Sequence, residues 1–251
     1  MTRIAAVGDI HVGADSVGRL ARGLRHVHQR ADVLLLAGDL TRCGDPSEAE
    51  LVATELEDVE VPIVGVLGNH DHHADRQDEV VRVLEDAGVR MLDGSSTTVD
   101  VDGVRVGIAG AKGFGGGFAG ASGTSFGETV MKAFVAETQR EATGLHDALI
   151  ELATEVDHRV ALLHYAPVPD TLRGERLEIY PFLGSYLLAE AVDTAGADLV
   201  LHGHAHAGSE RGLTPGGVRV RNVAQPVIQH AYRVFDLRAV APDEDVVRSP
   251  T

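Results

Sequence analysis

Short apolar runs that break directly into polar, metal-binding side chains are the feature that most constrains this chain. The run from Ala197 to Leu201 leads into His202, His204 and His206 at alternating positions. Such a run is typical of a short buried strand, and alternate side chains of an extended segment point to the same side. We therefore expect imidazoles to gather just past the end of a strand, where ligands bind in open α/β sheets.

The same arrangement recurs at four other places. The residues that follow these apolar runs are Asp9 and His11 after 3–7, Asp39 after 31–37, Asn69 and His70 after 61–67, and His164 after 159–163. Taken alone, a residue such as Asp39 could serve only as a turn residue or a helix cap. Caps do not need imidazole, however, and a cluster of this many histidines and carboxylates needs a cation to offset its charge and polarity.

The segments between the early runs have helical spacing, and strands that alternate with helices favour parallel βαβ units. The expected helices there span 17–30, 46–58 and 76–87. The pattern then changes, because Asp102-Gly103 between two alternating segments predicts a hairpin. The later elements that we expect are strands at 97–101, 104–108, 218–223 and 233–237, a glycine-rich mobile loop at 110–127, and helices at 129–155 and 186–194. We predict one domain over residues 1–240 and a frayed tail over 241–251.

Charge and composition exclude several classes of protein. The formal net charge of −16 and the lack of a Lys/Arg cluster argue against binding to long nucleic acids. No apolar run approaches the ~18 residues of a membrane span, and the N-terminal run is too short for a signal peptide. The single cysteine, Cys43, cannot form an intrachain disulfide, which fits a reducing compartment. We therefore expect a cytoplasmic protein without a membrane partner.

The order of the polar motifs is itself distinctive. Asp-x-His, Gly-Asp, Gly-Asn-His-Asp, a lone His and Gly-His-x-His follow one another between Asp9 and His206. This series resembles that of the calcineurin-like metallophosphoesterase superfamily, and every motif of the family is present. The resemblance implies an α/β (α+β) fold, a four-layer β-sandwich of two mixed sheets flanked by helices. It thereby revises the simple parallel-sheet interpretation.

The resemblance also implies a dinuclear metal centre. It assigns Asp9, His11, Asp39 and His206 to one ion, and Asp39, Asn69, His164 and His204 to the other. Asp39 would bridge the two, since a carboxylate has two oxygens and can span two ions. Oxygen and nitrogen ligands without a thiolate suit Mn, Fe, Zn or Co. The implied reaction is hydrolysis of a phosphodiester or phosphomonoester, most simply of a small nucleotide-like molecule, by in-line attack of a metal-bridging hydroxide.

Two further residues of the Gly-Asn-His-Asp motif are predicted to be catalytic. His70 matches the family position that helps to stabilise or protonate the reacting groups, and Asp71 could orient its ring, as carboxylates often do for histidines. The alternative for Asp71 is an ordinary helix cap. His202 lies outside the implied ligand set, and we expect it to form hydrogen bonds beside the site.

Candidate substrate contacts come from two variable segments. The glycine-rich stretch carries Lys112, Phe114 and Phe118, and the region 170–185 carries Arg173. Lys112 and Arg173 could contact a phosphate, and the phenylalanines could contact a leaving group or simply anchor the loop. The glycines match neither a dinucleotide-binding fingerprint nor a P-loop, because no Gly-Lys-Ser/Thr follows.

Three alternatives stay open at the level of function. The chain could be an inactive metal-binding interaction or scaffold protein on the same fold, or a nuclease. His202, His204 and His206 alone could form a mononuclear zinc site, although that leaves Asp39 and His164 unexplained. The sequence leaves open the choice between monoester and diester, the metal and the oligomeric state.

Overall fold

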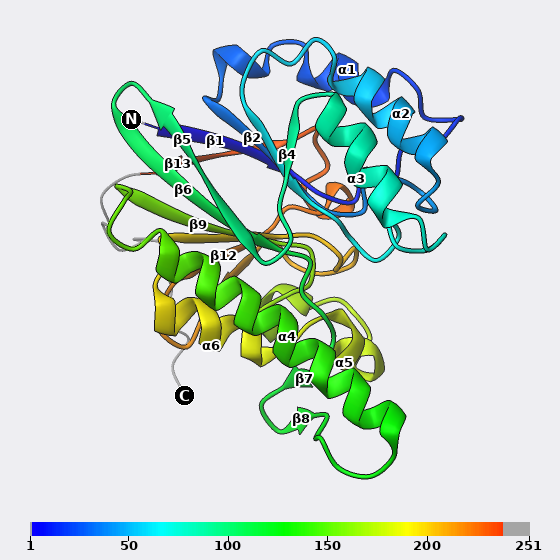
Figure 1. The fold of residues 1–251 in the computed structure, drawn as a ribbon, viewed down its shortest axis with the longest axis vertical. Coiled ribbons are helices and arrows are strands. Elements are labelled where there is room, and N and C mark those ends of the chain that lie inside the picture. Colours follow the sequence, from blue (N-terminus) through cyan, green and yellow to red (C-terminus); the bar gives the residue numbers. More distant parts are fainter. Residues whose placement is uncertain (1, 238–251) are drawn as a thin grey trace.

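Two β-sheets lie face to face in the computed structural model, which describes residues 2–237 (Figure 1). The first sheet has the order β13-β1-β2-β3-β4, and only β13 runs antiparallel to its neighbour. Its strands are β1 (Thr2–Val7), β2 (Val33–Ala37), β3 (Ile63–Val66), β4 (Val89–Met91) and β13 (Arg233–Leu237). The predicted tail, 241–251, lies outside the described residues.

The second sheet has the order β11-β12-β10-β9-β6-β5 and is also mixed, since β12, β10, β9 and β6 are parallel and the two edge strands are antiparallel. Its strands are β5 (Ser95–Val101), β6 (Val104–Ala111), β9 (His158–Leu163), β10 (Leu199–His202), β11 (Arg211–Leu213) and β12 (Arg219–Asn222). The four-layer sandwich of two mixed sheets is thereby confirmed.

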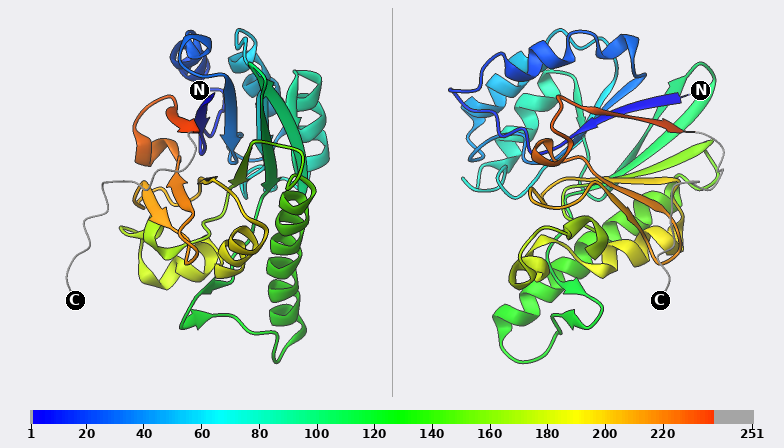
Figure 2. Two further views of the ribbon diagram at one scale, coloured as in Figure 1. Left: turned by 90° about the vertical axis from the view of Figure 1, so that its left-hand side faces the viewer. Right: turned by 180° about the vertical axis from the view of Figure 1, so that it is seen from behind.

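Helices cover the outer face of each sheet (Figures 1 and 2). The first sheet is covered by α1 (Arg19–Leu24), α2 (Pro46–Leu56) and α3 (Gln77–Asp86), and the second by α4 (Thr129–Glu151) and α6 (Tyr186–Ala195). The short elements are β7 (Gly117–Phe118), β8 (Ala121–Ser122), α5 (Tyr180–Leu183), α7 (Gln225–Ile228) and 3₁₀ turns at Val27–Gln29, Pro169–Leu172 and Leu177–Ile179.

The burial of both sheet faces explains why the central strands β2 and β3 have no polar residue in their sequences. In β2, Leu34 and Leu36 pack against the helices, whereas Val33 and Leu35 point into the layer between the sheets. Strands buried on both faces need apolar residues at every position. Because β1, β2 and β3 are parallel, as are β9 and β10, the loops that follow them meet along one edge of the sandwich.

Two of the segments that the sequence predicted have a different structure. The helix predicted at 17–30 begins only after Gly18, whose backbone is left-handed with φ of 78°, and it spans Arg19–Leu24, followed by a 3₁₀ turn at Val27–Gln29. The glycine-rich segment 110–127 was expected to be a mobile loop. At Gly115 and Gly116 it is instead packed against other elements. The Gly116 N–H donates to the Pro181 carbonyl at 2.7 Å, and a Cβ on Gly116 would lie 2.8 Å from Thr138 Cγ2.

Candidate metal centre

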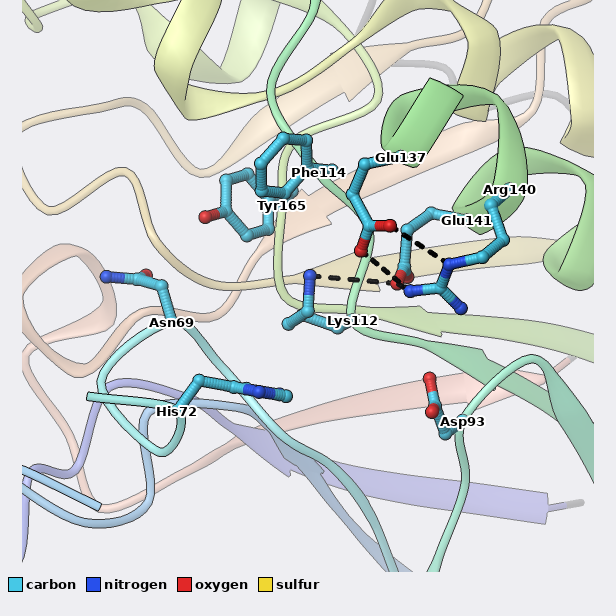
Figure 3. A pocket seen from close by; sticks show the side chains of 9 residues that line it. All are labelled: Asn69, His72, Asp93, Lys112, Phe114, Glu137, Arg140, Glu141 and Tyr165. Atoms are coloured by element: carbon cyan, nitrogen blue, oxygen red, sulfur yellow. Dashed lines mark hydrogen bonds and ion pairs between the residues drawn. The ribbon is translucent and has the colours of Figure 1, made fainter. Parts of the chain in front are cut away.

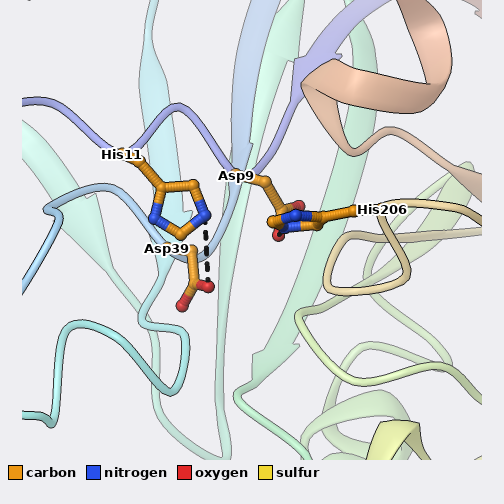
Figure 4. A group of neighbouring side chains, drawn as sticks. All are labelled: Asp9, His11, Asp39 and His206. Carbon is orange, nitrogen blue, oxygen red and sulfur yellow. Dashed lines mark hydrogen bonds and ion pairs between the residues drawn. The ribbon is translucent and has the colours of Figure 1, made fainter.

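The predicted ligands meet in two groups at the edge where the strands end. The first group contains Asp9, His11, Asp39 and His206, and Figure 4 shows these side chains turned toward one another. The second contains Asp39, His164 and His204. Within each group one ligand atom of every residue lies within 4.8 Å of the others, and Asp39 belongs to both.

The backbone is strained at four of these ligands. Asp9, His11, Asp39 and His204 have φ angles of 57°, 41°, 52° and 70°, and they make up most of the seven non-glycine residues with positive φ in the described chain. This region is uncommon for residues with a Cβ and costs about 1–3 kcal/mol each. The surrounding fold must therefore hold these loops in place.

Backbone contacts and glycines supply that support. The N–H groups of Asp9 and His11 donate to the carbonyls of Gly38 and Asp39 at 2.9 and 3.0 Å. A Cβ on Gly203 would lie 2.2 Å from Asp9 Oδ2, which is closer than any side chain tolerates. Only glycine therefore permits the loop after β10 to approach the first ligand group.

Asp9 and His206 form the best-paired contact of the first group. Asp9 Oδ1 lies 2.8 Å from His206 Nε2, and the His204 N–H donates to both Asp9 oxygens at 3.0 and 2.9 Å. Burial raises the pKa of Asp9 to about 6, and the carboxylate in turn raises the pKa of His206. The backbone of one predicted ligand thus orients the side chain of another.

His11 provides a test of whether a cation fits this group. Its Nε2 atom is buried and has no hydrogen-bond partner, and Asp39 Oδ2 lies 3.6 Å away. Buried polar atoms are almost always paired. An imidazole nitrogen without a partner beside two buried carboxylates is the arrangement that a divalent cation would complete, so these residues fit a metal.

The second group passes the same test. His164 Nδ1 lies 2.9 Å from the Ala37 carbonyl, so it carries the proton and leaves a lone pair on Nε2. Nε2 faces Asn69 Oδ1 at 2.9 Å and Asp39 Oδ1 at 3.3 Å. Burial holds the pKa of His164 well below its usual value, so the ring is neutral. Three acceptors converge there, and a cation would satisfy all of them.

His204 completes this group from the other side. Its ring lies 4.8 Å from the His164 ring and 4.3 Å from the Tyr165 ring, and its Nε2 lies 3.3 Å from the Phe182 carbonyl. Burial lowers the pKa of His204, which keeps the imidazole neutral. A neutral imidazole is the form that binds metals.

His70 and Asp71 lie beside the ligands but do not interact as predicted. The ring of His70 is 4.6 Å from that of His11, and its Nδ1 lies 2.7 Å from the Arg42 carbonyl. A backbone carbonyl, and not the Asp71 carboxylate, therefore orients this ring. Asp71 is fully buried and accepts hydrogen bonds from four donors. These are the backbone N–H groups of Leu40, Thr41 and Gly68 and the Thr41 hydroxyl, at 2.6 to 3.2 Å.

His202 lies outside both ligand groups, as expected, and is fully buried. Its Nδ1 lies 2.8 Å from the Gly203 carbonyl and its Nε2 2.8 Å from Thr171 Oγ1. Burial lowers the pKa of His202 to about 4, so the ring is neutral. His202 thereby ties the end of β10 to the turn at 169–172.

A pocket of about 250 Å³ opens beside the second ligand group (Figure 3). Its lining residues are Asn69, His72, Asp93, Lys112, Phe114, Glu137, Arg140, Glu141 and Tyr165. Burial raises the pKa values of Tyr165 and Glu141 and lowers the pKa of His72. The positive charge of Lys112 partly offsets the rise in the pKa of Glu141.

The structure separates the predicted substrate contacts into two pairs. Lys112 and Phe114 line the pocket. Phe118 is 6% exposed and packs in a small core with Leu172 and Leu183, so the interpretation as a loop anchor describes it better. Arg173 is exposed and pairs with Asp170 Oδ1 at 2.5 Å. We therefore do not propose Phe118 or Arg173 as substrate contacts.

Sequence reasoning missed most of the pocket wall. One face of α4 contributes Glu137, Arg140 and Glu141 to the pocket. In the sequence, such charged residues indicate only an ordinary solvent-exposed face of a helix. Tyr165 follows His164 directly, so its position next to a predicted ligand was a usable signal. Asp93 lies in the bend before β5 and is part of no sequence motif that indicates a function.

Comparison with known proteins identifies the family of this chain. A model of the calcineurin-like phosphoesterase family matches residues 2–208, and the chain belongs to that family. No significant match was found among curated protein sequences. None of the helices within residues 2–237 combines the length and the hydropathy that a bilayer-spanning segment requires.

Several solved structures share the fold at low sequence identity. Phosphopantetheinyl hydrolase (PptH) from Mycobacterium tuberculosis aligns over 99% of both chains with a TM-score of 0.68 and 15% identity. GAP50, the anchor in the inner membrane complex of Plasmodium, aligns over 90% of this chain and 72% of its own, with a TM-score of 0.57 and 13% identity. NAD nucleotidase (NadN) of Haemophilus influenzae aligns over 88% of this chain and 44% of its own, with a TM-score of 0.50 and 15% identity.

Proposed function

We propose that this protein is a dinuclear metal-dependent phosphoester hydrolase that acts on a small phosphorylated molecule. The observation that carries the proposal is the membership of Asp39 in two ligand groups. One carboxylate between two sets of imidazoles is suited to hold two ions close together. In two-metal sites the ions lie ~3.5–4 Å apart and act on both sides of the displaced group.

The proposed ligands are those that the sequence motifs indicate. Asp9, His11, Asp39 and His206 would hold one ion, and Asp39, Asn69, His164 and His204 would hold the other. Mn, Fe, Zn and Co are the metals compatible with these oxygen and nitrogen donors. When bound, the ions would supply Lewis-acid charge to the phosphoester and to the attacking water.

We assign the leaving-group side of the reaction to His70. Its Nδ1–H is held by the Arg42 carbonyl, so the ring is fixed and Nε2 is directed away from that bond. The ring lies beside His11 and is half-buried, which leaves it accessible to a substrate. Protonated at Nε2, His70 would donate to the oxygen of the departing alcohol.

Family membership and two of the similar structures support a hydrolase. PptH is named a hydrolase and NadN a nucleotidase. GAP50 is described as an anchor, so the alternative of an interaction protein on this fold is kept as an outcome of the experiment. The net charge of −16 disfavours a nuclease acting on long nucleic acids.

The test is a hydrolysis screen on protein loaded separately with Mn²⁺, Fe²⁺, Zn²⁺ or Co²⁺. It compares phosphomonoesters, cyclic nucleotides, linear diesters and dinucleotides, and metal content is measured on the same samples. We expect turnover of at least one class and about two ions per chain. About one ion per chain would favour the three-histidine zinc site, and no turnover with any metal would favour the interaction protein.

A further inference from the structure

The pocket in Figure 3 shares two residues with the surroundings of the second ligand group. Asn69 lines the pocket, and its Oδ1 lies 2.9 Å from His164 Nε2. Tyr165 also lines it, and its ring lies 4.3 Å from that of His204. A phosphoester placed at the ligand groups would therefore extend its organic part into this pocket. This inference rests on the proposed function.

The cations of the pocket are already engaged by the protein. Lys112 Nζ donates to the Gly113 carbonyl at 2.8 Å, lies 3.6 Å from Glu141 Oε1, and stands 5.0 Å from the centre of the Phe114 ring. Arg140 bonds Glu137 through two nitrogens at 3.0 and 2.7 Å and Glu141 at 2.8 Å. The charge of each side chain is therefore offset by carboxylates of the same pocket wall.

The remaining charge of the pocket is negative. Lys112 and Arg140 face three carboxylates, those of Asp93, Glu137 and Glu141. The hydrogen bonds and ion pairs that join residues 2–237 include none to the Asp93 carboxylate, which is exposed at the pocket wall. It acts electrostatically on Arg140 and Glu141, so it is close to the rest of the wall. Asp93 thus offers the pocket a carboxylate that no other described side chain engages by a hydrogen bond or an ion pair.

We infer that this pocket binds the leaving group and selects a small alcohol that carries a hydrogen-bond donor, above all an ammonium group, with Asp93 as the specificity-determining residue. A second phosphate would be repelled by the uncompensated carboxylate. The aromatic faces of Phe114 and Tyr165 would cover the carbon chain. At about 250 Å³, the pocket is smaller than the ~300–1,000 Å³ of drug-sized sites, so the group is small.

Matched substrates test this inference. The probes are 2-aminoethyl phosphate, propyl phosphate and 1,3-propanediol bisphosphate. Each is also used as its methyl diester, so that the comparison can be made whether the enzyme hydrolyses monoesters or diesters. We expect kcat/KM to be at least about tenfold higher for the aminoethyl probe than for the propyl probe, and lowest for the bisphosphate. A single charge-assisted hydrogen bond is sufficient for this ratio.

Asp93→Asn is the decisive variant, since this exposed side chain makes no bond that folding needs. The substitution should raise KM for the aminoethyl probe about tenfold and leave KM for the propyl probe unchanged. Asp86→Asn, an exposed residue at the end of α3, is the matched control and should preserve the preference. Equal kcat/KM values for the two probes in the wild type, or an unchanged preference in Asp93→Asn, would overturn the inference.

A binding measurement separates this inference from the proposed function. Calorimetric titration compares 3-aminopropylphosphonate with butylphosphonate, which have the same size and cannot be hydrolysed. Tighter binding of the amino compound, lost in Asp93→Asn, supports the pocket assignment even if no phosphoester is turned over. Equal binding of the two phosphonates contradicts the assignment, whereas absence of turnover contradicts only the proposed function.

Discussion

Asp39 is the single residue that both ligand groups require. Its carboxylate accepts a hydrogen bond from the His70 N–H at 2.8 Å and lies 3.6 Å from His11 Nε2 and 3.3 Å from His164 Nε2. Burial raises its pKa, and His70 and His11 oppose that shift. Each histidine offers one nitrogen to one ion, and the other carboxylate, Asp9, belongs to the first group alone, so of these residues Asp39 is the one placed to bridge.

Asp39→Asn should therefore weaken the binding of both ions. The substitution keeps the size of the side chain but leaves one neutral acceptor oxygen in place of a shared carboxylate. The measurement is metal content per chain by elemental analysis after gel filtration, with Asp86→Asn as the control that retains wild-type content. Loss of only one ion would show that Asp39 does not bridge.

His70→Ala should keep the metal content and lower turnover by roughly 10²–10⁴-fold, the usual contribution of a general acid. The ring does not belong to either ligand group, so its removal leaves the metal ligands in place. His73→Ala is a suitable control, because His73 is exposed and its ring lies 6.0 Å from that of His70. Full activity in His70→Ala would remove this residue from the mechanism.

At the scale of elements, Asp71 joins the ends of two neighbouring strands. Its carboxylate binds the Leu40 and Thr41 N–H groups after β2 and the Gly68 N–H after β3. These loops carry Asp39 and Asn69. The positions of two proposed ligands therefore depend on one buried carboxylate that accepts hydrogen bonds from the loops carrying them.

Asp71→Ala should lower the free energy of unfolding by about 3 kcal/mol or more, because several buried donors lose their acceptor and each costs about 1–3 kcal/mol. Denaturant unfolding in the presence of a chelator measures this loss without a metal contribution. Asp45→Ala removes the N-cap of α2 and should cost only ~1 kcal/mol. A loss for Asp71→Ala no larger than that of Asp45→Ala would contradict the anchoring role.

The elements that the sequence predicted well are the ones with long, uniform signals. The run 33–37 has apolar residues at every position because both faces of β2 are buried. The strands β4, β7, β8 and β11 span only two or three residues and leave no periodic pattern to detect. The glycines at 115–116 were interpreted as mobile, since composition cannot distinguish a flexible loop from a close backbone approach.

The candidate site also has features that the sequence indicates and features that only the folded chain creates. The convergence of the proposed ligands could be predicted because each follows a strand and has a side chain suited to metals. The strained backbone at Asp9 and His204, and the orientation of His70 by a carbonyl, depend on contacts between distant segments. The pocket was not predictable, because Glu141 of α4 meets Lys112 after β6 only through the packing of the helix on the second sheet.

For the whole molecule, the ligand groups connect the two sheets. Asp9 and Asp39 follow strands of the first sheet, whereas His164 and His206 follow strands of the second. Both groups combine residues from the two sides of the sandwich. The unfolded chain cannot bring these residues together, so binding of the proposed ions would be thermodynamically coupled to folding.

Removal of metal should therefore lower the thermal stability of the protein. Binding at a concentration about 1,000 times Kd adds about 4 kcal/mol, which corresponds to ~10 °C in Tm for a chain of this size. Differential scanning calorimetry with Mn²⁺ and with a chelator measures the shift. Asp39→Asn should have nearly the same Tm in both conditions, because its sites no longer bind. A Tm of the wild type that does not respond to Mn²⁺, Fe²⁺, Zn²⁺ or Co²⁺ would contradict a metal centre shared by the two sheets.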